Sequence, residues 1–312
     1  MSNSATVPAL TSDNVLVVAH DAGAALYLAK LLKQLKYSSN ITLIAHGPAK
    51  NIFEINLSTP QKRTIRWLDN FGEHALLNTQ HVITGSGWSS NLEIDAINKV
   101  KSIGIKCSTV LDHWANYRRR MTRNAILTKP DEFWVFDDYA FNIAKKEFHN
   151  EKINILKFDD PIIHELILTL GSVKVVSGQI LYITEPISKS GQMTSIPADS
   201  KVTEHESFLE FARVIKFIGW SGRILIRVHP SENVASYENL IKITGIVASI
   251  STEPNPLCDI AKSEFVVGLE SAMLGWAVSA GKPTYSILPL NGRVPYLPHS
   301  RIERFTNDTV LN

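Results

Sequence analysis

The chain has 312 residues, a length typical of two domains of about 100–200 residues each. Hydrophobic residues make up 44% and charged residues 20%, close to the average of globular proteins, which excludes extensive disorder. The net charge of +2 lacks the basic surplus of a general nucleic-acid binder, and no apolar run reaches the roughly 18–20 residues that cross a bilayer.

Short β-branched runs alternate with longer amphipathic segments in the first half of the chain. The first predicted strand is Asn14–Ala19, and the small-residue turn His20–Ala24 follows it. A helix with leucines on one face comes next, over Leu26–Leu35, before further strands at Ile41–Ala45 and His81–Thr84. This alternation predicts a parallel sheet covered by helices.

The next helix has a clear predicted start. Ser90 followed three residues later by Glu93 has the pattern of a capping box, and apolar residues at helical spacing come after it. The strand Lys106–Leu111 then ends in the polar run Asp112–Arg118, and Glu132–Phe136 is a further strand.

The strand–helix pattern restarts near Ser172–Gly178, which predicts a second domain. The predicted strands of this half are Ile180–Thr184, Arg223–Val228, Ile246–Ile250, Phe265–Val267 and Thr284–Ile287. The sequence therefore predicts an α/β fold of two Rossmann-like domains, residues 1–172 and 173–312, facing each other across a cleft. In such open sheets, ligands bind beyond the carboxyl ends of the strands.

One polar cluster at a predicted strand end is Arg227, His229 and Pro230. Proline cannot continue the strand, so we expect His229 to be held at the rim of the sheet. An imidazole there can bind a phosphate or protonate a leaving group. The alternative is a surface histidine beside a charge at the strand edge.

A second cluster is Glu270–Ser271, which precedes a predicted helix at Ala272–Ala280. Ser271 is expected at the N-cap, where backbone N–H groups and the helix dipole favour a phosphate. Glu270 is placed to accept hydrogen bonds from ribose hydroxyls. The alternative for Ser271 is an ordinary helix cap without a ligand.

A third cluster is the turn His20–Gly23. It lacks the full G-x-G-x-x-G pattern, and the chain has no P-loop, so neither a nicotinamide nor any other cofactor is expected. Asp21 is a candidate for catalysis, because the turn after a first strand is where a backbone approaches a ligand.

The fourth cluster is the polar run that begins with Asp112 and His113. A carboxylate beside an imidazole at a strand end can act as a general base for a hydroxyl group. Arginines in the same run, including Arg118, can hold an anionic acceptor. We predict that the acceptor site comprises His20, Gly23, Trp88, Asn116, Tyr117 and Arg118.

These motifs resemble those of a known superfamily, the GT-B glycosyltransferases. His229–Pro230 and the downstream Ser271 are similar to motifs of bacterial sialyltransferases, polysialyltransferases and Kdo-type capsule transferases, and CDP-glycerol polymer transferases have a similar His-Pro element. The strand Leu181–Thr184, with Pro186 after it, looks like theirs. The segments His20–Gly23 and Leu111–Tyr117 resemble uncharacterised proteins of bacterial surface-polysaccharide clusters.

The resemblance implies that residues 173–312 bind a nucleotide-sugar donor and residues 1–172 an acceptor. His229 would contact or protonate the donor phosphate, Ser271 would bind that phosphate, and Glu270 would face the ribose. The Asp/Glu-Asp/Glu-Gly motif of sialyltransferases is absent, so Asp21 or Asp112 is nominated as the base, with Glu185 in reserve.

The predicted function is a metal-independent glycosyltransferase that moves a sugar onto a bacterial surface glycan or a lipid-linked acceptor. The sugar is either a nonulosonic acid from a CMP donor or one carried by UDP. Two alternatives stay open: a UDP-sugar epimerase or nucleotide-sugar hydrolase, and a catalytically silent module of a polysaccharide assembly complex. The amino-terminal residues lack a signal-peptide pattern, which predicts a cytoplasmic protein. The arginines after Tyr117 leave open a peripheral association with the inner face of the membrane.

Overall fold

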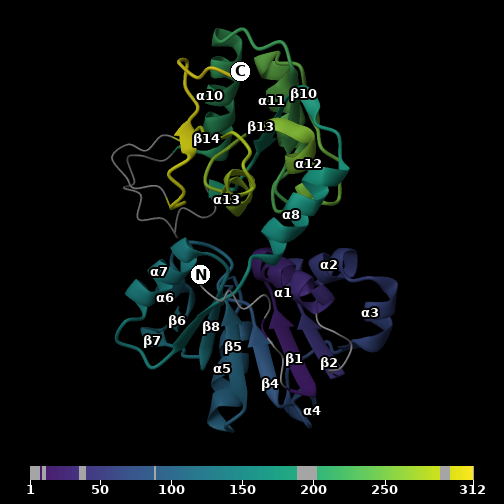
Figure 1. Cartoon of the computed structure of the whole chain (residues 1–312), viewed down its shortest axis with the longest axis vertical. Helices are drawn as coiled ribbons and strands as arrows, with labels where there is room; N and C mark the ends of the chain where they lie inside the picture. Colours follow the sequence, from purple (N-terminus) through teal and green to yellow (C-terminus); the bar gives the residue numbers. More distant parts are fainter. Residues whose placement is uncertain are drawn as a thin grey trace. The chain divides into compact units, whose positions relative to one another are not determined.

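The computed structural model describes residue 8 and residues 12–34, 40–87, 89–187, 202–288 and 296–311. They belong to two compact units, Met1–Ile162 (unit 1) and Ile163–Asn312 (unit 2), which run from purple to teal and from teal to yellow in Figure 1. The division lies in the first turn of α8 (Pro161–Ser172), earlier in the chain than the boundary predicted after residue 172. Each unit is built on its own parallel sheet.

Unit 1 contains a seven-stranded sheet in which all neighbouring strands are parallel. In sheet order its strands are β3 (Arg66–Trp67), β2 (Asn40–Ala45), β1 (Asn14–Ala19), β4 (His81–Thr84), β5 (Lys106–Val110), β8 (Glu132–Val135) and β9 (Asn154–Lys157). The chain reverses its direction across the sheet between β1 and β4. In a doubly wound sheet this switch point is where the carboxyl edge opens to a ligand.

Helices connect these strands. They are α1 (Ala22–Gln34), α2 (Gly47–Asn56), α3 (Thr59–Thr64), α4 (Glu73–Leu76), α5 (Leu92–Ser102), α6 (Tyr117–Arg120) and α7 (Asp138–Glu147). A short antiparallel pair, β6 (Thr122–Arg123) and β7 (Ile126–Leu127), follows α6. The predicted strands at the centre of the sheet are confirmed, because β1 and β4 have the predicted limits.

The predicted capping box at Ser90 and Glu93 is wrong. The helix α5 begins at Leu92 with Asn91 at its N-cap, and the Ser90 hydroxyl accepts from the Leu92 N–H. Glu93 turns inward instead, because its carboxylate accepts the backbone N–H of His20 at 2.7 Å. The Glu93 side chain therefore accepts from the His20 N–H at the end of β1, although the local sequence pattern predicted that it would cap the N-terminus of the helix.

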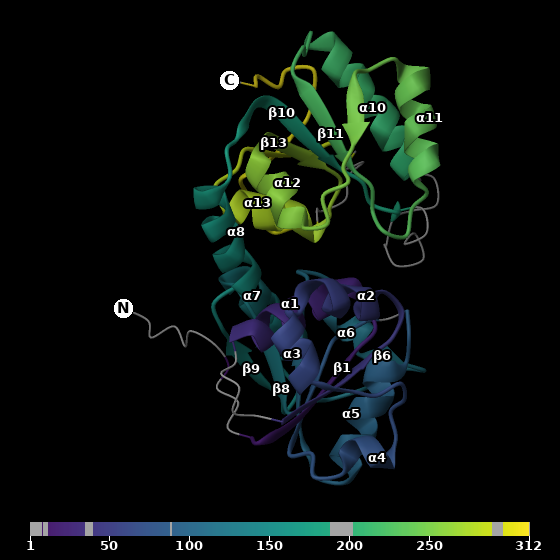
Figure 2. The ribbon, with the colours of Figure 1, turned by 90° about the vertical axis from the view of Figure 1, so that its right-hand side faces the viewer.

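Unit 2 contains a six-stranded sheet whose neighbouring strands are again all parallel. In sheet order its strands are β12 (Ala248–Ile250), β11 (Arg223–Arg227), β10 (Val176–Ile183), β13 (Ser263–Gly268), β14 (Thr284–Ser286) and β15 (Ile302–Arg304). The helices that the structure describes in full after α8 are α10 (Glu204–Phe217), α11 (Val234–Thr244), α12 (Pro256–Lys262) and α13 (Ala272–Ser279). The switch point lies between β10 and β13. Figure 2 shows α10 and α11 next to β11, and α12 and α13 next to β13.

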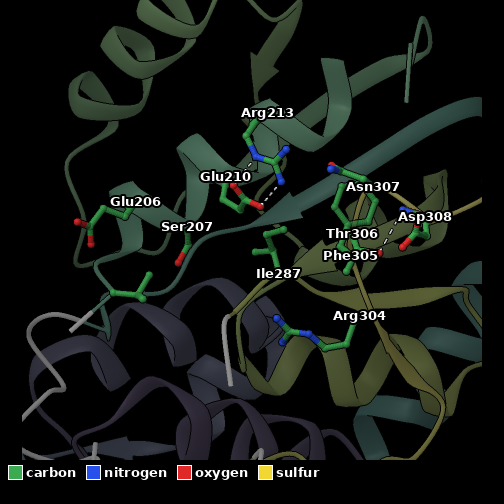
Figure 3. A pocket seen from close by; sticks show the side chains of 11 residues that line it. Glu206, Ser207, Glu210, Arg213, Ile287, Arg304, Phe305, Thr306, Asn307 and Asp308 are labelled. Atoms are coloured by element: carbon green, nitrogen blue, oxygen red, sulfur yellow. Dashed lines mark hydrogen bonds and ion pairs between the residues drawn. The ribbon is translucent and has the colours of Figure 1, made fainter. Parts of the chain in front are cut away.

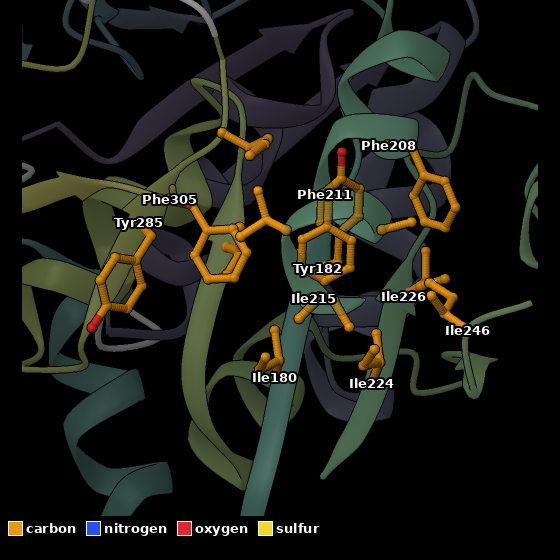
Figure 4. Close-up of a cluster of buried hydrophobic side chains, with 14 of the residues drawn as sticks. Ile180, Tyr182, Phe208, Phe211, Ile215, Ile224, Ile226, Ile246, Tyr285 and Phe305 are labelled. Atoms are coloured by element: carbon orange, nitrogen blue, oxygen red, sulfur yellow. The ribbon is translucent and has the colours of Figure 1, made fainter. Parts of the chain in front are cut away.

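An aromatic core lies between this sheet and the helices α10 and α11 (Figure 4). Tyr182 of β10 packs against Phe211 and Phe208, with ring centroids 4.4 Å and 5.3 Å away. Tyr237 of α11 meets Phe208 edge-on at 5.7 Å. Each buried aromatic side chain contributes a large apolar area, so this core fixes α11 against the end of β10.

Candidate active sites at the carboxyl edges of the two sheets

The candidate site of unit 1 forms at its switch point. The strands β1 and β4 are parallel neighbours, with Val18 opposite Thr84, so the residues that follow them emerge side by side. His20 and Asp21 follow β1, and Ser89 lies in the loop that follows β4. The sequence placed His20 and Asp21 here but gave no signal for Ser89.

His20, Asp21 and Ser89 are hydrogen-bonded to one another. The His20 Nδ1 lies 3.0 Å from Asp21 Oδ1 and 3.2 Å from the Ser89 hydroxyl, which also donates to Asp21. A carboxylate only accepts, so this contact places the proton of the neutral His20 ring on Nδ1 and the lone pair on Nε2. The side chains are 21% and 26% exposed for His20 and Asp21, so both are open to solvent at the edge.

Two glycines make room for this pair. A side chain at Gly47, which has a φ of +50°, would overlap the His20 ring near Nε2, and a side chain at Gly87 would overlap the Asp21 carboxylate. The glycine at position 47 also adopts a left-handed conformation that other residues rarely adopt. The chain therefore gives the imidazole and the carboxylate space that any larger residue would fill.

Glu93 lies beneath this turn and is 1% exposed. Burial raises the pKa of Glu93, and its Oε2 has no hydrogen-bond partner among the described residues. The folded state then binds a proton more tightly than the unfolded chain. Glu93 accordingly contributes stability that is fully present below the unfolded pKa and is lost as the pH rises through the folded pKa.

Replacing Glu93 with glutamine is expected to remove this loss. Glutamine keeps the oxygen that accepts from His20 but cannot ionise. Between the unfolded and folded pKa values of Glu93, the free energy of unfolding of Glu93→Gln should therefore rise relative to that of the wild type by up to about 1.4 kcal/mol per pH unit. Urea unfolding at a series of pH values above 4.5, the ordinary glutamate pKa, measures the difference. The control is Asp95→Asn, an exposed position on the same helix. Parallel stability curves for Glu93→Gln and wild type would contradict the prediction.

Asp112 follows β5 and is held by two partners. Its Oδ1 forms an ion pair with Arg120 at 2.8 Å and accepts from the Ser86 hydroxyl at 3.3 Å. Its other oxygen occupies the space that a side chain at Gly23 would need. Gly23, predicted to contact the acceptor, thus leaves room for the Asp112 carboxylate. The side chains of His20 and Asp21 are more exposed than that of Asp112.

The other predicted residues of unit 1 lie around α6. His113 Nδ1 accepts from the Trp114 N–H at 2.9 Å, so Asp112 and His113 have different partners. Asn116 is half-buried at the N-cap of α6 with a φ of 60°. Tyr117 is fully buried, and this burial removes it from the predicted acceptor surface. Trp88 lies outside the described residues.

The predicted acceptor residue Arg118, on α6, is paired with glutamates. Arg118 forms an ion pair with Glu151 at 2.8 Å, and its backbone N–H donates to Glu147. Lys129 pairs with the same Glu151 carboxylate at 2.7 Å. None of the helices within the described ranges is both long and apolar enough to cross a membrane.

The candidate site of unit 2 also forms at a carboxyl edge. His229 follows β11 and is exposed, and its backbone N–H donates to Thr184 at the end of β10. The backbone N–H of Ser231 donates to His229 Nδ1 at 3.2 Å. A backbone N–H can only donate, so Nδ1 accepts and the proton of the neutral ring lies on Nε2. His229 is therefore a hydrogen-bond donor at Nε2, the opposite tautomer to His20.

Glu185, Glu270 and Ser271 meet across the switch point of unit 2. The Glu185 carboxylate accepts the backbone N–H of Glu270 at 2.9 Å, which ties the loop after β10 to the loop after β13. Glu270 is buried, and its Oε1 accepts the Tyr296 N–H at 2.8 Å. Ser271 is the N-cap of α13, as predicted, and its hydroxyl accepts from Met273 at 3.3 Å. The phosphate and ribose contacts of these residues stay predictions.

Arg227, a predicted donor-binding residue, has internal partners. Its guanidinium forms an ion pair with the buried Asp259 at 2.6 Å and donates to the Glu253 carbonyl at 2.8 Å. Asp259 also accepts from the Ser251 hydroxyl. These contacts tie the end of β11 to the loop after β12, and the donor contact of Arg227 stays a prediction. Pro230, next to His229, is exposed.

Among the cavities formed by the described residues, two lie within unit 2. One of about 490 Å³ is lined by α10 and the chain around β15, and Figure 3 shows Arg213 turned toward Glu210 there. These two side chains form an ion pair at 2.6 Å. None of the predicted site residues lines it. A smaller one of about 200 Å³ adjoins Glu270 and is lined by His299 and Arg304, which sequence reasoning left without a role. Within the described ranges, no group of three or more His, Cys, Asp or Glu side chains could hold a metal ion.

Neither a protein-family model nor a curated protein sequence matches the chain. Among solved structures, UDP-GlcNAc 2-epimerase from Neisseria meningitidis bound to UDP-GlcNAc is similar, with a TM-score of 0.57, 12% identity and coverage of 95% of this chain and 88% of that one. UDP-GlcNAc 2-epimerase from Methanocaldococcus jannaschii has a TM-score of 0.55, 12% identity and coverage of 88% and 83%. The wall teichoic acid polymerase TagF has a TM-score of 0.55, 11% identity and coverage of 94% and 77%.

At these identities the likeness shows the fold. The chain has the α/β architecture with parallel sheets of two-domain GT-B-like proteins, and this confirms the predicted fold class. The same fold is shared by glycosyltransferases and epimerases, so the fold alone does not choose between those activities.

Proposed function

We propose that the protein is a glycosyltransferase that moves a sugar from a nucleotide-sugar donor to a hydroxyl group of an acceptor. The observation that carries this proposal is the pair of histidines in opposite tautomers, each at the carboxyl edge of a parallel sheet. His20 presents a lone pair at Nε2, and His229 presents a proton at Nε2. Transfer of a glycosyl group needs a base for the acceptor and a donor to the leaving phosphate.

In the proposed reaction, unit 1 supplies the base and unit 2 binds the donor. His20 takes the proton of the acceptor hydroxyl while Asp21 stabilises the positive ring. The acceptor oxygen bonds to the anomeric carbon, and the bond from that carbon to the phosphate oxygen breaks. His229 donates a hydrogen bond or a proton to that oxygen, and the N-terminus of α13 at Ser271 attracts the negative charge.

The proposed donor is a CMP-linked nonulosonic acid, with a UDP-sugar as the other donor class, and the proposed acceptor is a bacterial surface glycan. The similarity of His229–Pro230 and Ser271 to motifs of sialyltransferases and capsule transferases supports the first donor. A nonulosonic acid forms its oxocarbenium centre readily, so phosphate stabilisation and one base suffice for transfer.

A second candidate function is a UDP-sugar epimerase, which the structural likeness to two UDP-GlcNAc 2-epimerases favours. An epimerase converts its donor without an acceptor. Incubation of the protein with a nucleotide sugar alone therefore separates the two functions, because only an epimerase would interconvert the sugar under these conditions.

A thermal-shift titration with CMP, CDP, UMP, UDP and GDP tests the proposal. A nucleotide at a hundredfold excess over its dissociation constant should stabilise the protein by about 2.7 kcal/mol. We expect this shift with CMP or CDP, and its loss in His229→Ala. A shift with UDP alone would favour UDP-sugars and the epimerase, and no shift with any nucleotide would favour a catalytically silent module.

A further inference from the structure

A chain of hydrogen bonds lies behind His229 and ends at its backbone. Glu232 accepts from two buried hydroxyl groups, the Thr184 Oγ1 at 2.5 Å and the Tyr237 Oη at 2.6 Å. Both partners are 1% exposed. Thr184 in turn accepts the His229 backbone N–H at 2.8 Å. The carboxylate thus joins the ends of β10 and β11 to the aromatic core through α11.

The donors of this chain are directed toward Glu232. The His229 N–H can only donate, so the Thr184 hydroxyl accepts from it and gives its own proton to Glu232. Burial raises the pKa of Tyr237, and its hydrogen bond to Glu232 raises it further, so the phenol stays protonated and donates. Two donors therefore converge on Glu232, one on each oxygen of its carboxylate.

The same residue closes the turn that sets the tautomer of His229. The backbone N–H of Glu232 donates to the His229 carbonyl at 2.9 Å. This turn brings the Ser231 N–H to the His229 Nδ1, and the Ser231 hydroxyl lies 2.9 Å from the same nitrogen. The turn from His229 to Glu232 therefore sets both the backbone position of His229 and the ring nitrogen that carries its proton. Glu232, the last residue of this turn, is held by its two buried partners.

We propose that Glu232 is the positioning residue that holds His229 as an Nε2–H donor toward the anionic group of the ligand. The role of His229 toward a leaving phosphate rests on the proposed function, whereas the positioning itself does not. Glu232 acts through His229 and is not itself a catalytic residue. This role would account for an acidic side chain close to the proposed phosphate site, where a solvent-facing carboxylate would repel the ligand.

The tautomer can be measured directly by two-bond ¹H–¹⁵N correlation spectra of the histidine rings. The His229 signals are those that vanish in His229→Gln. In the wild type we expect Nε2 protonated and Nδ1 accepting. In Glu232→Gln, and in Thr184→Val, where the link to the His229 N–H is cut, we expect a mixture of both tautomers. Glu238→Gln, an exposed position on α11, is the matched control and should retain the wild-type spectrum.

A second measurement separates positioning from simple stability. In Glu232→Gln, kcat should fall by about 10- to 100-fold while the KM for the donor changes little, because a displaced donor group costs rate more than binding. Tyr237→Phe keeps the link through Thr184 and should show a smaller loss. Wild-type tautomer spectra in both Glu232→Gln and Thr184→Val would overturn the proposal. An inactive wild type with the expected spectra would refute the proposed function and leave the positioning role intact.

Discussion

Replacing His229 with alanine is expected to lower kcat for sugar transfer by about 10²–10⁴-fold, the usual contribution of a group that transfers a proton in the transition state. The ring is exposed, and its Nδ1 already accepts from Ser231, so the proton of the neutral ring lies on Nε2. Negative charge grows on the phosphate oxygen as the glycosidic bond breaks. A donor fixed before the reaction stabilises that charge without reorganisation.

Initial rates over a range of donor concentrations, at saturating acceptor, measure this loss. His229→Gln distinguishes two roles of the ring, because an amide donates a hydrogen bond but no proton. We expect it to restore nucleotide binding and leave kcat low. His164→Ala is the matched control, since His164 is exposed on α8 and lies in the same unit. A His229→Ala variant with wild-type kcat would remove His229 from the reaction.

The centres of the two sheets could be predicted from the sequence, and the edges could not. The strand β1 is an unbroken apolar run, buried from Val15 to Ala19, and such runs are strong signals. The edge strand β9 has a single buried residue, Ile155, and β3 has none. An edge strand pairs with one neighbouring strand and faces solvent on its other side, so it tolerates polar residues. Its sequence therefore carries little of the apolar pattern that predicts a strand.

The candidate sites were predicted in position but not in pairing. His20, Asp21 and His229 lie at the carboxyl ends of strands, as the topology rule requires. The adjacent Asp112 and His113 suggested a pair, yet Asp112 binds Arg120. Neighbouring strands, not neighbouring residues, set the contacts at such an edge. Ser89 meets Asp21 only because β4 lies beside β1.

Replacing Asp21 with asparagine is the second prediction with a large effect. The carboxylate accepts from His20 Nδ1 and so keeps the lone pair on Nε2. An amide can present its NH₂ group to Nδ1, which favours the other tautomer and leaves Nε2 protonated, unable to accept a proton. We expect kcat to fall by about 10²–10⁴-fold. The exposed Asp95→Asn on α5 is the control for the change of charge.

Nucleotide binding should distinguish Asp21→Asn from His229→Ala. The nucleotide-induced thermal shift is expected to be unchanged in the first variant, because Asp21 belongs to unit 1, and lost in the second, because His229 belongs to unit 2. Loss of turnover in both variants, with loss of binding in one, is the pattern of a base on one unit and a donor site on the other. If Asp21→Asn transfers sugar at the wild-type rate, the base is not the His20 pair. The base would then be sought at Asp112, whose Oδ1 is held in an ion pair with Arg120.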